Sequence, residues 1–122
     1  MNGRLVHLEL HTGDLPHARD FYARLLDWRP ERVVTPAGTY LTMTPSGDLG
    51  AGIVECRVRR PVWLPYVEVD DIKAITTQAT ELGAAVLLGP REGPAGWRSV
   101  LALPGAGEVA LWQPKSRNGG ET

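Results

Sequence analysis

The chain has 122 residues, of which 43% are hydrophobic and 22% are charged, and its formal net charge is −1 at pH 7. This length fits one compact domain, and the composition is that of an ordinary soluble protein. No basic run indicates a nucleic-acid partner, and no apolar run approaches the roughly 20 residues of a membrane-spanning helix. Cys56 is the single cysteine and permits no internal disulfide. With no signal peptide recognisable at the start, we expect a cytoplasmic protein.

Residues 6–28 predict a strand, a capped turn and an amphipathic helix. His7, Glu9 and His11 alternate with leucines, so these three ionisable side chains share one face of the strand. Asp14 is a candidate N-cap for the helix. The apolar stripe of the helix, at three- and four-residue steps, consists of Leu15, Ala18, Phe21, Tyr22, Leu25 and Leu26. The leucines of the strand therefore face this helix, and the ionisable triplet faces away from it.

Three strands follow the first helix, separated by turns rich in proline and glycine. We expect these strands at residues 31–35, 39–44 and 49–56, with the second turn at residues 45–48. Residues 57–61 form a polar connector, after which the pattern begins again.

The second half repeats the order of strand, helix and three strands. It is predicted to hold a strand at 62–69, a helix capped by Asp71 and ended by Gly83, and strands at 84–88, 97–103 and 108–113. Residues 89–96 are expected to be a loop, because they contain two prolines and three glycines. The polar tail, residues 116–122, is expected to fray.

The two halves align when Asp14 is placed on Asp71, and the apolar positions of the two helices then coincide. A repeat of a whole supersecondary unit indicates that neither unit closes its core alone. We therefore expect an α+β fold in which two βαβββ modules form curved mixed sheets around a central cavity, with the helices outside. The expected single domain is 1–115, with module boundaries at 1–59 and 60–115.

Three motifs carry a resemblance to the vicinal oxygen chelate superfamily, which includes glyoxalase I, bleomycin-resistance proteins and extradiol dioxygenases. They are VHLELHTGDLPHARDFYARLLDW, WLPYVEVDDIKA and GWRSVLALPGAGEVALWQ. The chain most resembles the short bacterial glyoxalase-like proteins of this group. The third motif departs from the group's pattern, since residues 103–107 stand where a DPxGN turn is frequent.

The resemblance implies a metal site drawn from four positions, two in each half. These positions correspond to His7, a residue near Glu55, Leu64 and Ala110. Leucine and alanine side chains cannot bind a metal ion, and a catalytic metal normally needs about three protein ligands. We therefore expect the fold and its pocket, with no bound metal and no other cofactor.

Strand alternation predicts which side chains line the pocket. We expect His7, Glu9 and His11 to be catalytic, and Tyr40, Tyr66, Glu68 and Trp112 to bind the ligand. Side chains two positions apart on a strand are roughly 6.6–7 Å apart, so contacts within the triplet are not expected from the backbone spacing. Two alternatives stay open for the triplet: a solvated outer face, or three side chains that only satisfy one another.

The ionisable face favours a metal-independent enzyme that isomerises, cyclises or eliminates a small aromatic or carbonyl compound by proton transfer. Sequestration of a small molecule, as in bleomycin-resistance proteins, explains the aromatic wall equally well. A metal-dependent glyoxalase or dioxygenase, its site completed by a second subunit, is the weaker alternative. We also expect a homodimer, with contacts through Trp28, Trp63 and Trp97 and the pocket at or near the interface.

Overall fold

A computed structural model of the chain describes residues 3–36, 38–46, 49–56, 62–105 and 107–115. The predicted connector 57–61 and the predicted tail 116–122 lie outside these residues. The chain divides into two compact units: we call Val6–Leu64 the first module, and Pro65–Thr122 together with Met1–Leu5 the second module. Within the described ranges, no helix has both the length and the apolar character needed to cross a membrane.

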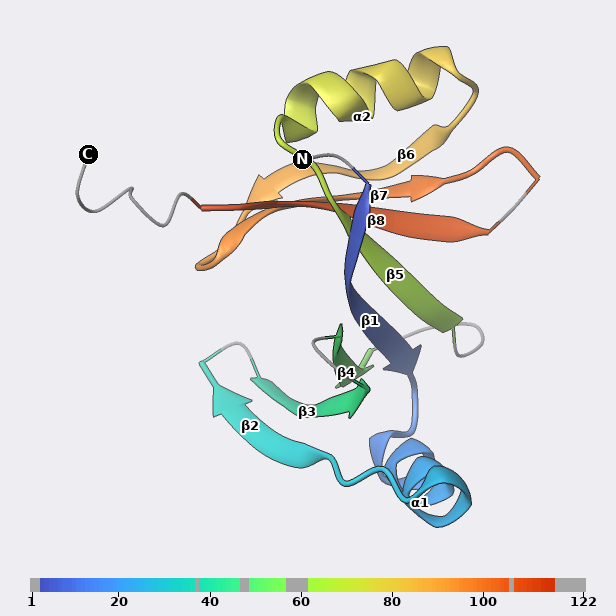
Figure 1. Cartoon of the computed structure of the whole chain (residues 1–122), viewed down its shortest axis with the longest axis vertical. Helices are drawn as coiled ribbons and strands as arrows, with labels where there is room; N and C mark the ends of the chain where they lie inside the picture. Colours follow the sequence, from blue (N-terminus) through green and yellow to red (C-terminus); the bar gives the residue numbers. More distant parts are fainter. Residues whose placement is uncertain (1–2, 37, 47–48, 57–61, 106, 116–122) are drawn as a thin grey trace. The chain divides into compact units, whose positions relative to one another are not determined.

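The first module is a four-stranded mixed sheet with one helix (Figure 1). Its elements are β1 (Arg4–Thr12), α1 (Leu15–Leu26), β2 (Glu31–Thr35), β3 (Gly38–Ser46) and β4 (Leu49–Glu55). The strands pair in the order β2-β3-β4-β1, in which β1 is parallel to β4 and the other pairs are antiparallel. The parallel pair requires a long connection, which α1 and the β2–β3 hairpin supply.

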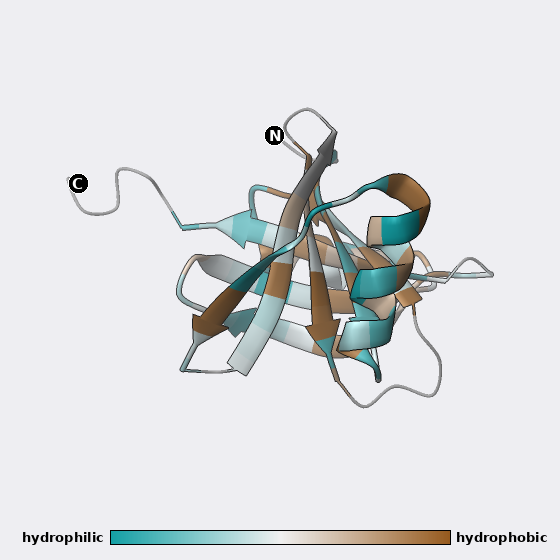
Figure 2. Ribbon diagram, turned by 90° about the horizontal axis from the view of Figure 1, so that it is seen from below, coloured by the Kyte–Doolittle hydropathy of each residue, from teal (hydrophilic) through white to brown (hydrophobic). Residues whose placement is uncertain are grey.

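Helix α1 packs on one face of this sheet through a small apolar core. The buried members of the core are Leu10, Ala18, Leu41, Met43, Ala51 and Ile53. Asp14 caps the helix as predicted, since its Oδ1 accepts a hydrogen bond from the backbone N–H of His17 at 3.0 Å. Asp27 ends the helix in the left-handed region with φ 58°. Figure 2 shows the hydrophobic and hydrophilic stretches that alternate along the helix and the strands.

The second module repeats the same arrangement. Its elements are β5 (Val62–Glu68), whose residues 62–64 belong to the first module, α2 (Ile72–Glu81), β6 (Ala85–Glu92), β7 (Gly96–Ala102) and β8 (Glu108–Pro114). The strands pair in the order β5-β8-β7-β6, again with one parallel pair, β5 with β8. Asp71 caps α2 by accepting from Ala74 N at 3.2 Å, and Gly83 follows the helix with φ 102°.

Helix α2 covers one face of the second sheet (Figure 1). Its core consists of Val69, Ile72, Leu101 and Leu111, with Trp97 packed against them. A buried hydrogen bond of 3.0 Å joins the hydroxyl groups of Thr76 on α2 and Ser99 on β7. The predicted α+β class and the doubled βαβββ order are therefore confirmed.

Two predicted turns are shorter than expected. Residues 89–92, expected to be loop, continue β6 as far as Glu92. Because β6 is last in the strand order of its module, the missing N–H of Pro90 removes no necessary ladder bond, and two register shifts absorb the irregularity. Likewise β3 continues through Pro45 to Ser46, with a register shift after Met43.

Candidate functional site

The face of the first sheet opposite α1 carries the predicted catalytic triplet. Leu10 belongs to the core under α1, so His7, Glu9 and His11 project from the other face of β1. Strand pairing places His7 beside Gly50, Glu9 beside Gly52 and His11 beside Val54. The side chains of His7, Glu9 and His11 are 32%, 17% and 23% exposed, so none of them is a fully solvated surface group.

Both histidines of the triplet lie against the one carboxylate. The imidazole Nε2–H of His11 donates to Oε1 of Glu9 at 2.7 Å, and Nε2 of His7 lies 3.6 Å from Oε2 of the same carboxylate. The expectation that strand spacing keeps these groups apart is wrong, because side chains on a strand lean along its direction and bridge the gap. A carboxylate and an imidazole in direct hydrogen bond can exchange a proton with each other and with a bound molecule.

Two glycines that we did not single out from the sequence make room for His7. A Cβ atom on Gly50 would lie 3.3 Å from Nδ1 of His7, and one on Gly52 would lie 3.6 Å from its Nε2. The imidazole therefore lies close over the backbone of β4, and a Cβ atom at position 50 would require it to shift by a few tenths of an ångström. The available signal was the two-residue spacing of these glycines, which puts both on one face of a predicted strand.

Tyr40 lies on the same face as the triplet. Leu41 and Met43 of β3 belong to the core under α1. Tyr40 alternates with them along the strand and therefore projects from the opposite face. Tyr40 pairs with Val54, which in turn pairs with His11. The half-buried phenol thus stands two strands away from His11 across one continuous surface.

Glu55 lies on the other side of β4. It continues the alternation of Ala51 and Ile53, which are core residues, and its Oε2 accepts from Leu15 N at the start of α1 at 3.4 Å. The metal-ligand position expected near Glu55 is therefore absent from the face of the triplet, where β4 contributes only Gly50, Gly52 and Val54.

The donors present do not fit the four-position metal site that the resemblance implies. Leu64 and Ala110 fill two positions and are 2% and 0% exposed, and Glu55 supports α1 instead. In the described part of the chain, no group of three or more His, Cys, Asp or Glu side chains is arranged to hold a metal ion.

Cys56 follows directly after β4, and Glu9 of the triplet affects the pKa of its thiol. Burial raises the pKa of its thiol, and the negative charge of Glu9 raises it further. The backbone N–H of Cys56 donates to Thr12 O at 2.9 Å, which fixes the residue beside the end of β1.

The face of the second sheet opposite α2 carries the other predicted ligand-binding residues. Leu111 faces α2, so Trp112 projects from the opposite face, where pairing places it beside Glu68. Tyr66 stands on the same face and is 6% exposed. Nη2 of Arg4 lies 3.9 Å from Oε1 of Glu68, within the same module.

Arg98 is a residue of this second face that sequence reasoning missed. Its Nη1 donates to the hydroxyl oxygen of Tyr66 at 3.0 Å. The alternation in GWRSVLA contained the signal, because Ser99 and Leu101 face α2 and Arg98 must then face the other way.

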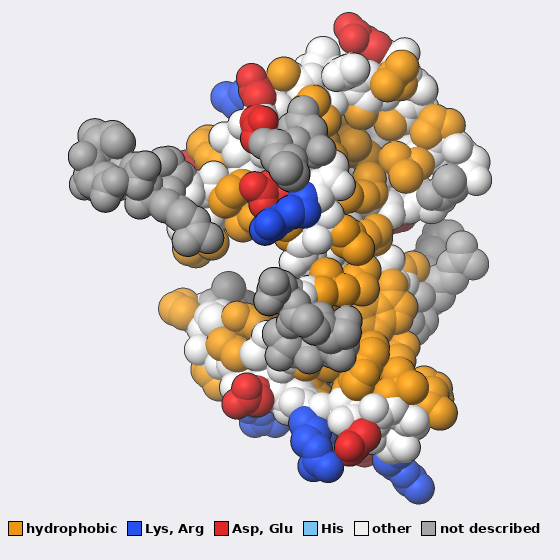
Figure 3. Space-filling model, in the orientation of Figure 1, with side chains coloured by type: hydrophobic (Ala, Val, Ile, Leu, Met, Phe, Trp, Pro, Cys, Tyr) orange, Lys and Arg blue, Asp and Glu red, His pale blue; other side chains and the backbone are white. Residues whose placement is uncertain are grey.

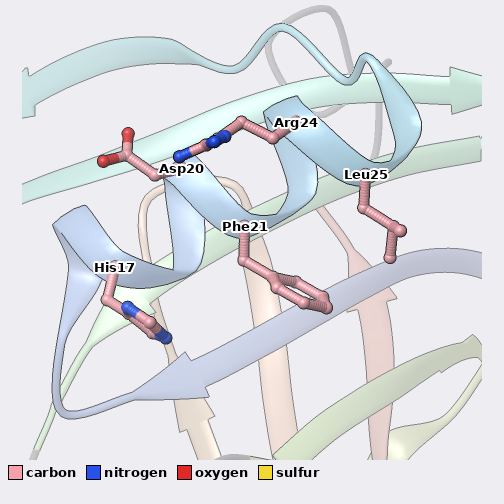
Figure 4. A pocket seen from close by; sticks show the side chains of 5 residues that line it. All are labelled: His17, Asp20, Phe21, Arg24 and Leu25. Carbon is pink, nitrogen blue, oxygen red and sulfur yellow. The ribbon is translucent and has the colours of Figure 1, made fainter.

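A separate pocket of about 490 Å³ lies along the outer surface of α1 and includes none of the predicted site residues. Its lining residues are His17, Asp20, Phe21, Arg24 and Leu25. Figure 4 shows His17, Phe21 and Leu25 projecting from one side of the helix, with Asp20 and Arg24 on another. One helix, α1, supplies the whole described lining of this pocket.

Comparison with known proteins gives a family match over most of the chain. Residues 4–102 match the family model described as the Glyoxalase/Bleomycin resistance protein/Dioxygenase superfamily. Proteins named "Putative glyoxylase CFP32" from Mycobacterium bovis and Mycobacterium tuberculosis are 29% identical over 114 residues. The alignment covers 87% of this chain but only 44% of those relatives, so the chain spans less than half of their length.

Solved structures share the fold at low sequence identity. The methylmalonyl-CoA epimerase of Mycobacterium tuberculosis has a TM-score of 0.61 at 15% identity, covering 94% of this chain and 89% of its own. The hypothetical protein BH1468 of Bacillus halodurans C-125 has a TM-score of 0.66 at 14% identity, covering 94% of this chain and 96% of its own.

Proposed function

Since the chain belongs to the glyoxalase/bleomycin resistance protein/dioxygenase superfamily, we propose that it is a metal-independent enzyme that moves a proton on a small carbonyl-bearing or aromatic substrate. Glu9 is the proposed base, and His7 and His11 are its partners in proton transfer. The substrate binds over the first-module face that also carries Tyr40.

One observation carries this proposal: a single, largely buried carboxylate lies between two imidazoles, at 2.7 Å from His11 and 3.6 Å from His7. A carboxylate can take a proton from the carbon next to a carbonyl group, and the electron pair of that C–H bond then moves into an enolate. His7 is the most exposed of the three side chains and can return a proton to a neighbouring carbon or oxygen. No atom is gained or lost in such an isomerisation.

Metal independence is supported by the side chains on the first-module face. His7, Glu9 and His11 all come from one strand, and β4 adds two glycines and a valine, which supply no metal ligand. Among the described residues, no group of three or more His, Cys, Asp or Glu side chains is arranged to hold a metal ion.

Methylmalonyl-CoA epimerases are among the proteins of similar fold, but at 15% identity this similarity concerns the fold and does not indicate the substrate.

The test is exchange of carbon-bound hydrogen for deuterium in D₂O, followed by proton NMR on a panel of small ketones, 2-oxo acids and aryl ketones. We expect the wild-type protein, treated with EDTA, to accelerate exchange of at least one compound. Glu9→Gln keeps the shape of the side chain and removes the base, so exchange is expected to fall by roughly 10²–10⁴-fold.

Glu55→Gln is the matched control, because it makes the same change on the α1 side of β4 and should leave the exchange rate within about twofold. Equal exchange by wild type and Glu9→Gln contradicts the proposed base. Exchange that disappears with EDTA and returns with a divalent metal contradicts metal independence.

A second candidate, sequestration without chemistry, is favoured by the hydrogen bond between His11 and Glu9. Because these side chains already satisfy each other, they can form one wall of a binding surface that performs no reaction. Under this alternative, a compound from the panel binds wild type and Glu9→Gln with similar affinity, and neither protein exchanges its hydrogens.

We also propose that the chain forms a homodimer. The proposed contact is the surface of α1, and not the three tryptophans that were expected from the sequence. Trp28 and Trp63 pack on the first core and Trp97 on the second, so they are occupied within their own modules. Phe21 and Leu25, by contrast, are 50% and 62% exposed. Figure 3 shows hydrophobic side chains over the α1 region, with acidic and basic groups beside them.

The charges of α1 suit a second copy of the same helix. Asp20 precedes Arg24 by one turn, so an antiparallel copy related by a two-fold axis brings each Asp20 toward the other Arg24. Light scattering at micromolar concentration should give about twice the chain mass of 13.3 kDa. Phe21→Glu with Leu25→Glu should return the mass to that of one chain, whereas a wild-type mass of one chain throughout contradicts the dimer.

A further inference from the structure

An apolar row of side chains crosses the first sheet beside the proposed proton-transfer triplet. Strand pairing places Val54 of β4 beside His11 of β1, and Tyr40 of β3 beside Val54. Val33 of β2 is next in the row, beside Tyr40. Directly paired residues on neighbouring strands project from the same face, so the whole row lies on the face opposite α1. Each of the four side chains is half-buried.

The core under α1 does not account for this row. The members of that core on β4 are Ala51 and Ile53, which alternate with Val54 and therefore project from the other face. Two valines and a phenol thus present apolar surface that no described hydrophobic core covers, and this surface is continuous with the triplet. An apolar wall beside a few polar groups is the usual make-up of a small-molecule site.

The other side of Glu9 is occupied by an imidazole. His7 lies over β4, where Cβ atoms at Gly50 and Gly52 would be 3.3 Å and 3.6 Å from its nitrogens Nδ1 and Nε2. The carboxylate of Glu9 makes its hydrogen bond of 2.7 Å to His11, which is the side on which the apolar row begins. A substrate at this carboxylate therefore has the imidazole on one side, and its apolar group fits toward the row.

The thiol of Cys56 gives a second indication that the carboxylate acts on this part of β4. Burial raises the pKa of the thiol, and the negative charge of Glu9 raises it further. Cys56 lies two residues beyond Val54 along the chain. The charge of Glu9 is therefore felt past Val54, so a molecule bound against this valine lies within the influence of the carboxylate.

We propose that Val54, Tyr40 and Val33 bind the aryl group of the substrate, which is an aryl ketone. The ring lies against the branched side chain of Val54 and the phenol of Tyr40, and the carbonyl end lies at Glu9. Glu9 takes a proton from the carbon next to the carbonyl group, and the electron pair of that C–H bond forms the enolate. Return of a proton from the carboxyl group to the same carbon restores the ketone. This reaction rests on the proposed function of Glu9, whereas binding of the aryl group does not.

Acetophenone and acetone are the probes, because they differ only in a phenyl group against a methyl group. Isothermal titration measures the binding of each, and the loss of the methyl proton signal in D₂O measures exchange. We expect the wild-type protein to bind acetophenone at least about tenfold more tightly than acetone, with a similar preference in kcat/KM for exchange.

Val54→Thr keeps the branched shape of the side chain and places a hydroxyl group in the row. It should reduce the preference for acetophenone by about fivefold or more, and Val33→Thr should reduce it by less, because Val33 lies farther from Glu9. Val34→Thr is the matched control, since Val34 is 74% exposed and alternates with Val33 along β2. This variant should keep the preference within about twofold of wild type.

Circular dichroism checks that each variant is folded, and Val33→Thr takes the place of Val54→Thr if the latter does not fold. The inference is overturned if wild type binds acetophenone no more tightly than acetone, or if Val54→Thr and Val34→Thr change the preference equally. Glu9→Gln separates this result from the proton transfer. If wild type exchanges no compound and yet shows the preference in binding, with Val54→Thr reducing it, the proton transfer fails and the aryl site stands.

Discussion

The imidazole of His7 lies over the backbone of Gly50, so closely that a Cβ atom added there would approach its Nδ1 to 3.3 Å. Because β4 has no side chain at position 50, the imidazole of His7 can lie close to the backbone of this strand. A histidine beside a branched residue in this register would be lifted away from the sheet and from Glu9.

We therefore expect Gly50→Val to displace His7 while leaving the strand intact, because valine favours extended backbone. The proton NMR signals of the His7 imidazole should move, and the proton-exchange activity should fall by roughly tenfold or more. Gly89→Val is the control, since a Cβ atom on Gly89 meets nothing within 4 Å. Unchanged His7 signals in folded Gly50→Val would show that the imidazole does not depend on the glycine.

Cys56 is expected to report the charge of Glu9. Burial and the Glu9 carboxylate both raise the pKa of the thiol, so Glu9→Gln should lower this pKa toward its ordinary value. Because the thiolate is the reactive form, alkylation of Cys56 by iodoacetamide at pH 8 should become faster in that variant. Glu55→Gln, which changes the preceding residue but is no cause of the shift, should leave the rate as it is.

The same raised pKa sets the direction of a pH effect on stability. The folded state holds Cys56 as the neutral thiol, whereas the unfolded chain releases this proton near its ordinary pKa of about 8.5. The contribution of this group to stability is therefore complete below that pH and is lost as the pH rises. Cys56→Ala should flatten the decline in the free energy of unfolding above pH 8.5, measured by urea titration.

Gly96→Ala should destabilise the second module. The added Cβ atom would collide with the carbonyl oxygen of Gln113 and with the ring of Trp112, so either the backbone or the indole must shift. Overpacking of this kind costs about 1–3 kcal/mol in the free energy of unfolding. Gly93→Ala is the matched control, because its Cβ atom would only reach ordinary contact with Gly96 O at 3.7 Å. Equal stabilities in urea would contradict the collision.

The buried hydroxyl pair of Thr76 and Ser99 should show coupling in a double-mutant cycle. Thr76→Val removes one hydroxyl and leaves Ser99, which is 0% exposed, without this hydrogen bond, at a cost of about 1–3 kcal/mol. Adding Ser99→Ala removes the stranded group, so the double variant should lose less than the two single losses together. Additive losses in urea unfolding would mean that the hydroxyls do not stabilise each other.

Local signals in the sequence determined most of the elements. Asp14 and Asp71 each cap a helix through a hydrogen bond three residues along, which depends on nothing distant in the chain. Strand alternation likewise placed His7, Tyr40 and Trp112 on the faces that the helices leave uncovered. The continuation of β6 through Pro90 was beyond local signals, because only the position of β6 at the end of a strand order makes a proline acceptable there.

The candidate site was predictable by face but not by contact. The spacing of β1 correctly placed Glu9 and His11 on one side, yet their hydrogen bond depends on side-chain rotamers that a backbone repeat does not specify. Glu55 was assigned by a loose alignment, and a shift of one residue in a strand reverses the face. The faces on which Arg98 and Gly50 lie also follow from strand alternation, when this rule is applied to every predicted strand.

The division of the chain has a consequence for its synthesis. Gly3 N donates to Glu68 O at 2.9 Å, so the beginning of β1 belongs with the second module, while the rest of β1 belongs with the first. During translation, Val6–Leu64 can emerge from the ribosome and fold as a unit, but residues 3–5 have to wait for a partner more than sixty residues downstream. Residues 3–5 thus precede the other described residues in synthesis and are yet among the last of them to be fixed.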